Sequence, residues 1–209
     1  AKSGDYFVRL IDSDQGASKT VEVTKNIEFT RLDISNGEVL GAFIDKFPVQ
    51  AIVSALPYFH GPVIATVARE KNLHYFDLTE DVEVAKKIKQ ISEKSEKAFV
   101  PQSGLAPGFI SIVAQDLIQK FETVDAVRMR VGALPMNPNN ALKYSLTWST
   151  DGLINEYGNP CEAIIDGEMA SVQPLEGLET IEVDGLLYEA FNTSGGLGTL
   201  AESCLGKVN

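Results

Sequence analysis

Two side chains of this sequence have the chemistry to move a proton to or from a small ligand. His60 begins a predicted helix just after a predicted strand, and a neutral imidazole can accept a proton near physiological pH. Asp77 ends the next predicted strand, where a carboxylate can take up an amine proton or hold an ammonium group. Both are candidate catalytic residues. The alternative for His60 is that it is a surface residue at the start of a helix, with no catalytic role.

Other residues have the types and positions expected of a dinucleotide site. Asp12 ends a predicted strand and can bind ribose hydroxyls, which favours NAD over NADP because the following Ser13 and Asp14 bring no arginine for a 2′-phosphate. The alternative for Asp12 and Asp33 is a structural role, in which each side chain closes a turn. Ligands of open α/β sheets bind at the carboxyl ends of the strands. The predicted cofactor residues are Asp12, Asp33, Ser54, Ala55, Leu56, Pro57 and Gly104.

Three further segments offer groups that can position a substrate. The loop at Gly104–Gly108 begins a helix, so its amides can face an anion, although a plain hinge is the alternative. Tyr144 and Trp148 lie on one face of a predicted strand, where a core role is the alternative for the tryptophan. Hydroxyls and bare amides at 193–196 suit a carboxylate, or simply form a tight turn. The predicted substrate residues are Ala106, Pro107, Gly108, Tyr144, Trp148, Thr193, Ser194 and Gly195.

The first half of the chain must place these residues with a parallel α/β sheet, because strand and helix signals alternate along it. The strand at 50–56 is apolar enough to be buried on both faces. Asn36 and Thr79 are the predicted caps of two helices. Strands are expected at 6–12, 27–32, 50–56, 74–78 and 98–101, and helices at 36–47, 60–71 and 79–97.

The second half predicts a mixed α+β domain, with a helix that has Pro107 in its first turn. In one of its strands Arg128 and Arg130 share a face. The expected elements are a helix at 107–121 and strands at 124–134, 142–148, 181–183 and 186–191. The predicted domains are therefore a Rossmann-like nucleotide-binding domain at 1–104 and a substrate-binding and dimerisation domain at 105–209.

A Rossmann-like domain requires a glycine-rich turn before the strand that ends at Asp12, and the sequence shows none. Residues 1–4 would then be the tail of the preceding helix, and the chain would be an N-terminally truncated fragment. Alternatively, 6–12 is a true first strand and the fold binds no dinucleotide. Gly195-Gly196-Leu197-Gly198 is a weak phosphate loop, since no strand clearly precedes it.

Composition narrows the classes of partner. Of 209 residues, 44% are hydrophobic, which supports a sizeable core, and the net charge is −11. Residues 106–209 carry 5 Lys+Arg against 14 Asp+Glu, which argues against nucleic acid or an anionic membrane as partner. Two cysteines do not make a disulfide framework, so we expect a reducing compartment, the cytoplasm. Neither has a base or ligand-like spacing beside it, which predicts no thiol nucleophile and no metal.

Five motifs in order resemble the saccharopine dehydrogenase family, and lysine 6-dehydrogenase within it. They are Val53-Ser54-Ala55-Leu56-Pro57-Tyr58, Ser103-Gly104-Leu105-Ala106-Pro107-Gly108, Gly132-Ala133-Leu134-Pro135, Leu142-Lys143-Tyr144-Ser145-Leu146-Thr147-Trp148-Ser149 and Phe191-Asn192-Thr193-Ser194-Gly195-Gly196. The resemblance implies a homodimeric NAD(P)-dependent oxidoreductase that acts on the C–N bond of a small amino acid such as lysine or saccharopine.

The sequence departs from this family in one further respect. Saccharopine reductases carry a lysine in the helix after the Pro-Tyr turn, and here no lysine precedes Lys71 in that stretch. The alternatives are a saccharopine or carboxylated-polyamine reductase, for which Arg128 and Arg130 are the candidate cations, and a non-catalytic binding or dimerisation scaffold.

Overall fold

The structure is a computed structural model that describes residues 6–22, 24–132, 134–137, 139–141, 143–146 and 148–208. The helix tail predicted at residues 1–4 lies outside this range. The chain forms two compact units, Ala1–Val49 and Gln50–Asn209. Within the described ranges, no helix is both long and apolar enough to cross a membrane.

The first unit is a small parallel α/β element. Its parts are β1 (Val8–Asp12), the 3-10 helix η1 (Gln15–Lys19), β2 (Ile27–Arg31) and α1 (Gly37–Lys46). The two strands pair in parallel, from Val8 opposite Ile27 to Asp12 opposite Arg31. The side chain of Asn36 accepts a hydrogen bond from the Glu38 amide at 2.8 Å, so the predicted cap of α1 is confirmed.

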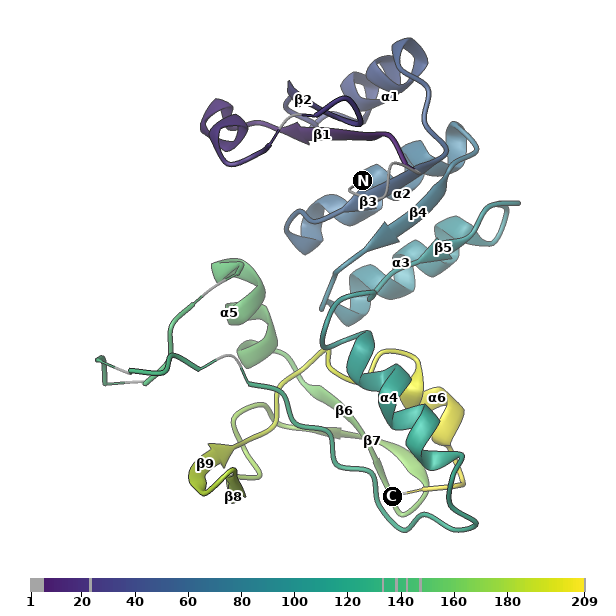
Figure 1. The fold of residues 1–209 in the computed structure, drawn as a ribbon. Coiled ribbons are helices and arrows are strands. Elements are labelled where there is room, and N and C mark those ends of the chain that lie inside the picture. Colours follow the sequence, from purple (N-terminus) through teal and green to yellow (C-terminus); the bar gives the residue numbers. More distant parts are fainter. Residues whose placement is uncertain are drawn as a thin grey trace. The chain divides into compact units, whose positions relative to one another are not determined.

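The second unit begins with a three-stranded parallel sheet in the order β3-β4-β5 (Figure 1). Its elements are β3 (Ala51–Ser54), η2 (Tyr58–His60), α2 (Gly61–Glu70), β4 (His74–Asp77), α3 (Val82–Ser92) and β5 (Phe99–Val100). Since parallel strands all point the same way, their carboxyl ends lie at one edge of the sheet. The prediction of parallel pairing in the first half of the chain is confirmed.

The core of this sheet lies on the side that carries Tyr75. This ring is fully buried, stacks on Phe99 with 5.5 Å between centroids, and directs its hydroxyl toward the Gly61 carbonyl of α2. Ile88 of α3 is also fully buried and packs against Gly61. Val53 points to the opposite face and is 70% exposed, so the prediction that this strand is buried on both faces is wrong.

The rest of the second unit combines helices with two antiparallel hairpins. Its elements are α4 (Phe109–Ile118), α5 (Thr150–Gly158), β6 (Cys161–Ile165), β7 (Glu168–Val172), β8 (Glu179–Val183), β9 (Leu186–Ala190) and α6 (Leu200–Cys204). β6 pairs with β7 and β8 with β9, which confirms the strands expected near 181–183 and 186–191. Helices α4 and α6 lie side by side in Figure 1, around a core of Ala114, Leu200, Cys204 and Val208.

Two predicted strands are wrong. The described residues of 124–134 form no strand, because Val124, Val127 and Met129 pack against the α4–α6 core without a pairing partner. Arg128 and Arg130 therefore share no strand face. The described residues of 142–148 form no strand either. There the Asn140 side chain donates to the Tyr144 carbonyl at 2.7 Å and accepts from its amide at 3.3 Å, a local turn that competes with a strand.

Three helix boundaries also differ from prediction. The cap of α3 is Asp81, not Thr79, because its carboxylate accepts from the Val84 amide at 2.6 Å. The same helix ends at Ser92, before the last lysines of the predicted range. Pro107 lies just outside α4, since Gly108 has a φ of +130° and the helix starts after it. The elements α5, β6, β7 and α6 were not predicted.

The packing of α3 generates a stability prediction. Replacing Ile88 by alanine is expected to lower the free energy of unfolding by about 2–5 kcal/mol, because it leaves a cavity between α2 and α3. The control Lys87→Ala removes an exposed side chain of the same helix and is expected to change it by less than about 0.5 kcal/mol. Urea unfolding followed by circular dichroism measures both. Equal effects of the two substitutions would contradict this packing.

Candidate functional site

The carboxyl end of β4 organises the site around the side chain of Asp77. This carboxylate is 3% exposed and accepts three hydrogen bonds, from the Tyr75 hydroxyl at 2.7 Å, the Thr79 amide at 3.0 Å and the Gln102 amide at 2.9 Å. The Asp77 carbonyl also accepts from the Ser103 amide at 2.8 Å. Asp77 thus ties together the segments that leave β4 and β5.

The hydrogen bonds explain how a charged group is buried here. A buried carboxylate is tolerated when its oxygens accept several hydrogen bonds. Burial, and to a smaller degree the Asp77 carboxylate, raise the pKa of the Tyr75 phenol, so the phenol keeps its proton and stays a donor. This geometry favours a role for Asp77 in positioning the surrounding backbone.

The turn after β4 is covered by α5. The Asn155 amide donates to Asp81 at 3.0 Å, on the carboxylate oxygen that does not cap α3. Gly152 packs so closely on Glu80 that a Cβ built on this glycine would lie 2.8 Å from Glu80 Oε1. Helix α5 is therefore held to the carboxyl edge of the sheet by one hydrogen bond and one tight backbone contact.

The predicted substrate loop at 193–196 packs against the same turn. Ser194 is buried, its amide donates to the Glu156 carbonyl at 3.0 Å, and its hydroxyl donates to the Asn155 carbonyl at 3.4 Å. Gly195 has a φ of +83°, and a Cβ there would lie 2.2 Å from the Glu80 carbonyl oxygen. Only glycine permits both this backbone conformation and this contact.

Two glutamates that the sequence reasoning missed belong to this junction. Burial raises the pKa of Glu80, a hydrogen bond from its own backbone amide partly opposes this, and the charges of Asp81 and Asp77 raise it further. Burial and the charge of Glu80 raise the pKa of Glu156 to about 7. The adjacent acids Glu80 and Asp81 are the sequence feature that could have indicated this acidic junction. Glu156 has no such signal, because it lies on a helix that was not predicted.

A groove of roughly 2000 Å³ borders this junction within the second unit. Gln102, which follows β5, lines it. So do four of the predicted substrate residues, which come from three distant segments of the chain: Ala106, Tyr144, Thr193 and Gly195.

The remaining predicted substrate residues support the walls of the groove. Pro107 is fully buried, and Gly108 bridges to Gly104 with so little room that an added Cβ would lie 2.4 Å from the Gly104 carbonyl oxygen. The Trp148 indole donates to the Tyr144 hydroxyl at 3.3 Å, so these two rings meet although no strand carries them. The same indole covers Gly152 at the start of α5.

The predicted cofactor residues of the second unit lie at the end of β3. Ser54 is buried, Ala55 and Leu56 are exposed, and Pro57 is half-buried. His60 follows at the start of α2, half-buried beside the Phe59 ring at 4.6 Å. It does not line the groove described above.

The predicted cofactor residues of the first unit both close turns. Asp12 ends β1 and its side chain accepts from the Asp14 amide at 2.8 Å. Asp33 follows β2 and accepts from the Ser35 amide at 2.9 Å. Both show the Asx-turn geometry of the structural alternative.

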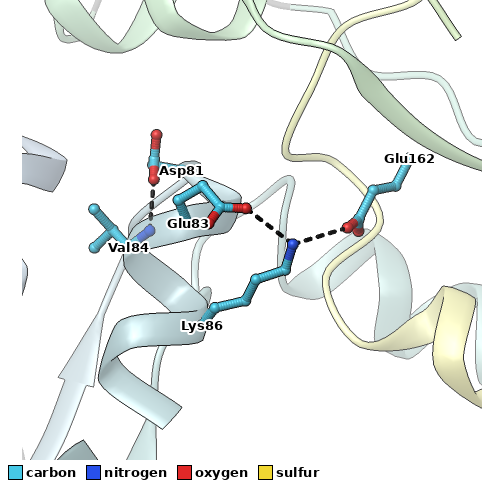
Figure 2. A network of polar contacts seen from close by, with 5 residues as sticks. All are labelled: Asp81, Glu83, Val84, Lys86 and Glu162. Atoms are coloured by element: carbon cyan, nitrogen blue, oxygen red, sulfur yellow. Dashed lines mark hydrogen bonds and ion pairs between the residues drawn. The ribbon is translucent and has the colours of Figure 1, made fainter. Parts of the chain in front are cut away.

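Exposed ion pairs connect α3 to the hairpin and helix beyond the groove. Figure 2 shows the Lys86 ammonium between Glu83, at 2.9 Å, and Glu162 of β6, at 3.7 Å. Lys89 approaches Glu202 of α6 at 3.6 Å. Such exposed pairs contribute little stability singly. Across the described residues, no cluster of His, Cys, Asp or Glu has the arrangement of a metal site.

Comparison with known proteins finds a family match over the second half of the chain. Residues 104–205 match the family described as Saccharopine dehydrogenase C-terminal domain. This match confirms the resemblance seen in the five motifs over the second half of the chain.

Curated relatives agree with this match. The chain is 28% identical over 165 residues to the alpha-aminoadipic semialdehyde synthase of Arabidopsis thaliana, which covers 75% of this chain. It is 22% identical over 127 residues, or 58% of this chain, to the mitochondrial alpha-aminoadipic semialdehyde synthase of Rattus norvegicus. The matched segments span only 15% and 14% of the lengths of these relatives.

The glycine contacts at the junction generate a second prediction. Gly195→Ala is expected to lower the free energy of unfolding by roughly 1–3 kcal/mol, because the new methyl group meets the Glu80 carbonyl in a strained backbone conformation. The neighbouring Gly196 has no heavy atom within 4 Å of its Cβ position, so Gly196→Ala is the matched control. Urea titrations that give indistinguishable midpoints for the two variants would refute the contact.

Proposed function

We propose that this chain forms the substrate side of an NAD(P)-dependent oxidoreductase that acts on the C–N bond of a lysine- or saccharopine-type amino acid. The observation that carries the proposal is the groove in which Ala106, Tyr144, Thr193 and Gly195 converge beside the carboxyl edge of a parallel sheet. Open α/β sheets bind their ligands at this edge. The family match supplies the class of reaction.

The chemistry is an oxidation followed by a hydrolysis. The carbon that bears the amine loses hydride, and the nitrogen loses a proton, which gives an imine. Water then adds to the imine carbon and the C–N bond breaks, which gives an aldehyde and an amine. The semialdehyde in the names of the matched relatives is a product of this kind.

The groups of the groove suit the polar ends of an amino acid. The Thr193 hydroxyl and the loop amides offer donors to a carboxylate, and the Tyr144 hydroxyl can accept from or donate to the amine. Asp77 holds the backbone of the flanking turns. His60 and Asp77 are the two proton acceptors that we propose from the sequence, and neither lines the groove, so their role depends on a substrate that reaches beyond it.

We propose the end of β3 as the place of the nicotinamide half of a dinucleotide. A parallel strand ends there at the buried Ser54, and the exposed backbone of Ala55 and Leu56 follows. We propose that this stretch and Gly104 hold the nicotinamide, and that Asp12 and Asp33 of the first unit bind the adenosine side of NAD, with NADP as the alternative. When bound, the cofactor accepts the hydride. The proposed Rossmann-like arrangement, with domains at 1–104 and 105–209, rests on these assignments.

The choice between lysine and saccharopine turns on extra cations. Saccharopine carries additional carboxylates, and both Arg128 and Arg130 line the groove. Arg130 makes a bidentate pair with Glu179 at 2.6 and 2.7 Å, so Arg128 is the cation that we propose for a larger substrate. A homodimer in a reducing compartment, the cytoplasm, completes the proposal.

Enzyme activity tests the reaction class directly. In the natural polypeptide that contains these residues, we expect reduced-nicotinamide absorbance to rise when NAD is mixed with lysine or with saccharopine. Turnover of lysine alone assigns the lysine dehydrogenase type, and turnover of saccharopine alone assigns the saccharopine type. Neither cofactor binding nor turnover would favour the non-catalytic scaffold.

A substitution in the groove tests the substrate residues. Thr193→Val removes one hydroxyl and keeps the shape, so we expect KM for the amino acid to rise roughly tenfold, a loss of about 1.4 kcal/mol of binding. The control Thr150→Val lies at the exposed start of α5 and is expected to leave KM unchanged. Steady-state kinetics with kcat and KM measured separately would contradict the assignment if the two variants behaved alike.

A further inference from the structure

We propose that Glu80 and Glu156 form a carboxyl pair that binds one exchangeable proton between β4 and α5, and that loss of this proton loosens α5 and the 193–196 loop together. The pair is a proton-sensitive device built into the junction. This proposal goes beyond the proposed redox reaction, because measurements of folding stability alone are expected to reveal the pair.

Glu80 supplies the buried half of the pair. Its residue is 8% exposed, and its Oε1 atom is shielded from solvent with no hydrogen-bond donor within reach among the described residues. The Glu80 carboxyl has a hydrogen bond from its own backbone amide, but Oε1 has none. By comparison, Asp77 accepts three hydrogen bonds, and Asp81 accepts from Val84 and from Asn155. A charged carboxylate oxygen without a partner is costly to bury, and a proton removes that charge.

Glu156 supplies the second half from the facing helix. It lies four residues after Gly152 in α5, so the two residues share the helix face that packs on Glu80. Its backbone carbonyl accepts from the Ser194 amide, which links the pair directly to the 193–196 loop. The backbone of Glu156 therefore lies where helix α5 and the loop meet, and its side chain shares the helix face that packs on Glu80.

The surrounding charges favour protonation. The charges of Asp81 and Asp77 act on Glu80, and the charge of Glu80 acts on Glu156. The phenols of Tyr157 and Tyr144 are the other titratable groups at this helix face, and their neutral form brings no positive charge. Since two carboxylates in one buried site resist ionising together, the site retains a proton that two exposed glutamates would lose.

The sign of the pH effect follows from linkage. Burial raises the pKa of Glu156 from its ordinary value near 4.5 to about 7, so between these values the folded chain binds more protons than the unfolded chain. Stability contributed by the proton is complete at acidic pH and is lost as pH rises through the folded-state value. The chain should thus be destabilised at alkaline pH by this pair.

Thermal unfolding of the full chain tests the pair. Glu156→Gln keeps the shape and a neutral side chain, so we expect it to raise Tm by roughly 4 °C or more at about pH 8.5, and by less than half of that at about pH 5.5. Glu80→Gln is expected to act in the same direction. In the double variant the increase in Tm should be smaller than the sum of the two single increases, because either substitution alone relieves the repulsion between the carboxylates.

Controls separate the pair from general charge effects. Glu168→Gln on β7 removes an exposed glutamate and should shift Tm equally at both pH values. Infrared spectra near neutral pH provide a readout other than stability, since the wild-type chain should show a protonated carboxyl band that the double variant Glu80→Gln, Glu156→Gln lacks. A Glu156→Gln effect that is the same at both pH values, or the absence of that band, would overturn the proposal.

Discussion

The architecture of the second unit depends on the hydrogen bonds that the buried Asp77 carboxylate accepts at the end of β4. One oxygen takes the Tyr75 hydroxyl and the other takes the amides of Thr79 and Gln102, so a single charged group orders the segments that follow two neighbouring strands. A buried carboxylate left without these donors would be strongly destabilising. The segments thus ordered lead into the cap of α3 on one side and into the groove at Gln102 and Ala106 on the other. Removing the charge would therefore disturb the groove as well as the sheet.

Close backbone contacts then join the second half of the chain to this edge. Gly152 and Gly195 approach Glu80 from different segments, at distances that leave no room for a side chain. Asn155 binds Asp81, and Ser194 binds the last turn of α5, so hydrogen bonds join the loop, the helix and the turn. This explains why residues far apart in sequence, such as Tyr144 and Thr193, line one groove.

Much of the first half could be predicted because its signals are local. The Asn36 cap, the strand that ends at Asp77 and the parallel pairing follow from periodicity and from the residues at strand ends.

The second half of the chain was harder to predict, for physical reasons. The alternation at 124–134 comes from side chains that pack on helices, and Asn140 builds a turn where 142–148 looked like a strand. The Glu80–Glu156 junction requires the packing of α5, which no local pattern of residues 149–158 announced. Ala106, Tyr144, Thr193 and Gly195, which were predicted from the family motifs, line one groove, and their role in binding stays a prediction.

The claim that the groove is an amino-acid site can be tested on this chain by nuclear magnetic resonance. Titration with lysine or saccharopine should shift the amide signals of Gln102, Ala106, Tyr144, Thr193 and Gly195, which line the groove. The exposed Asp166, in the turn between β6 and β7, should stay unchanged and serves as the internal reference. Shifts confined to the groove are the result that the account predicts. Shifts spread over the surface, or none at saturating ligand, would contradict it.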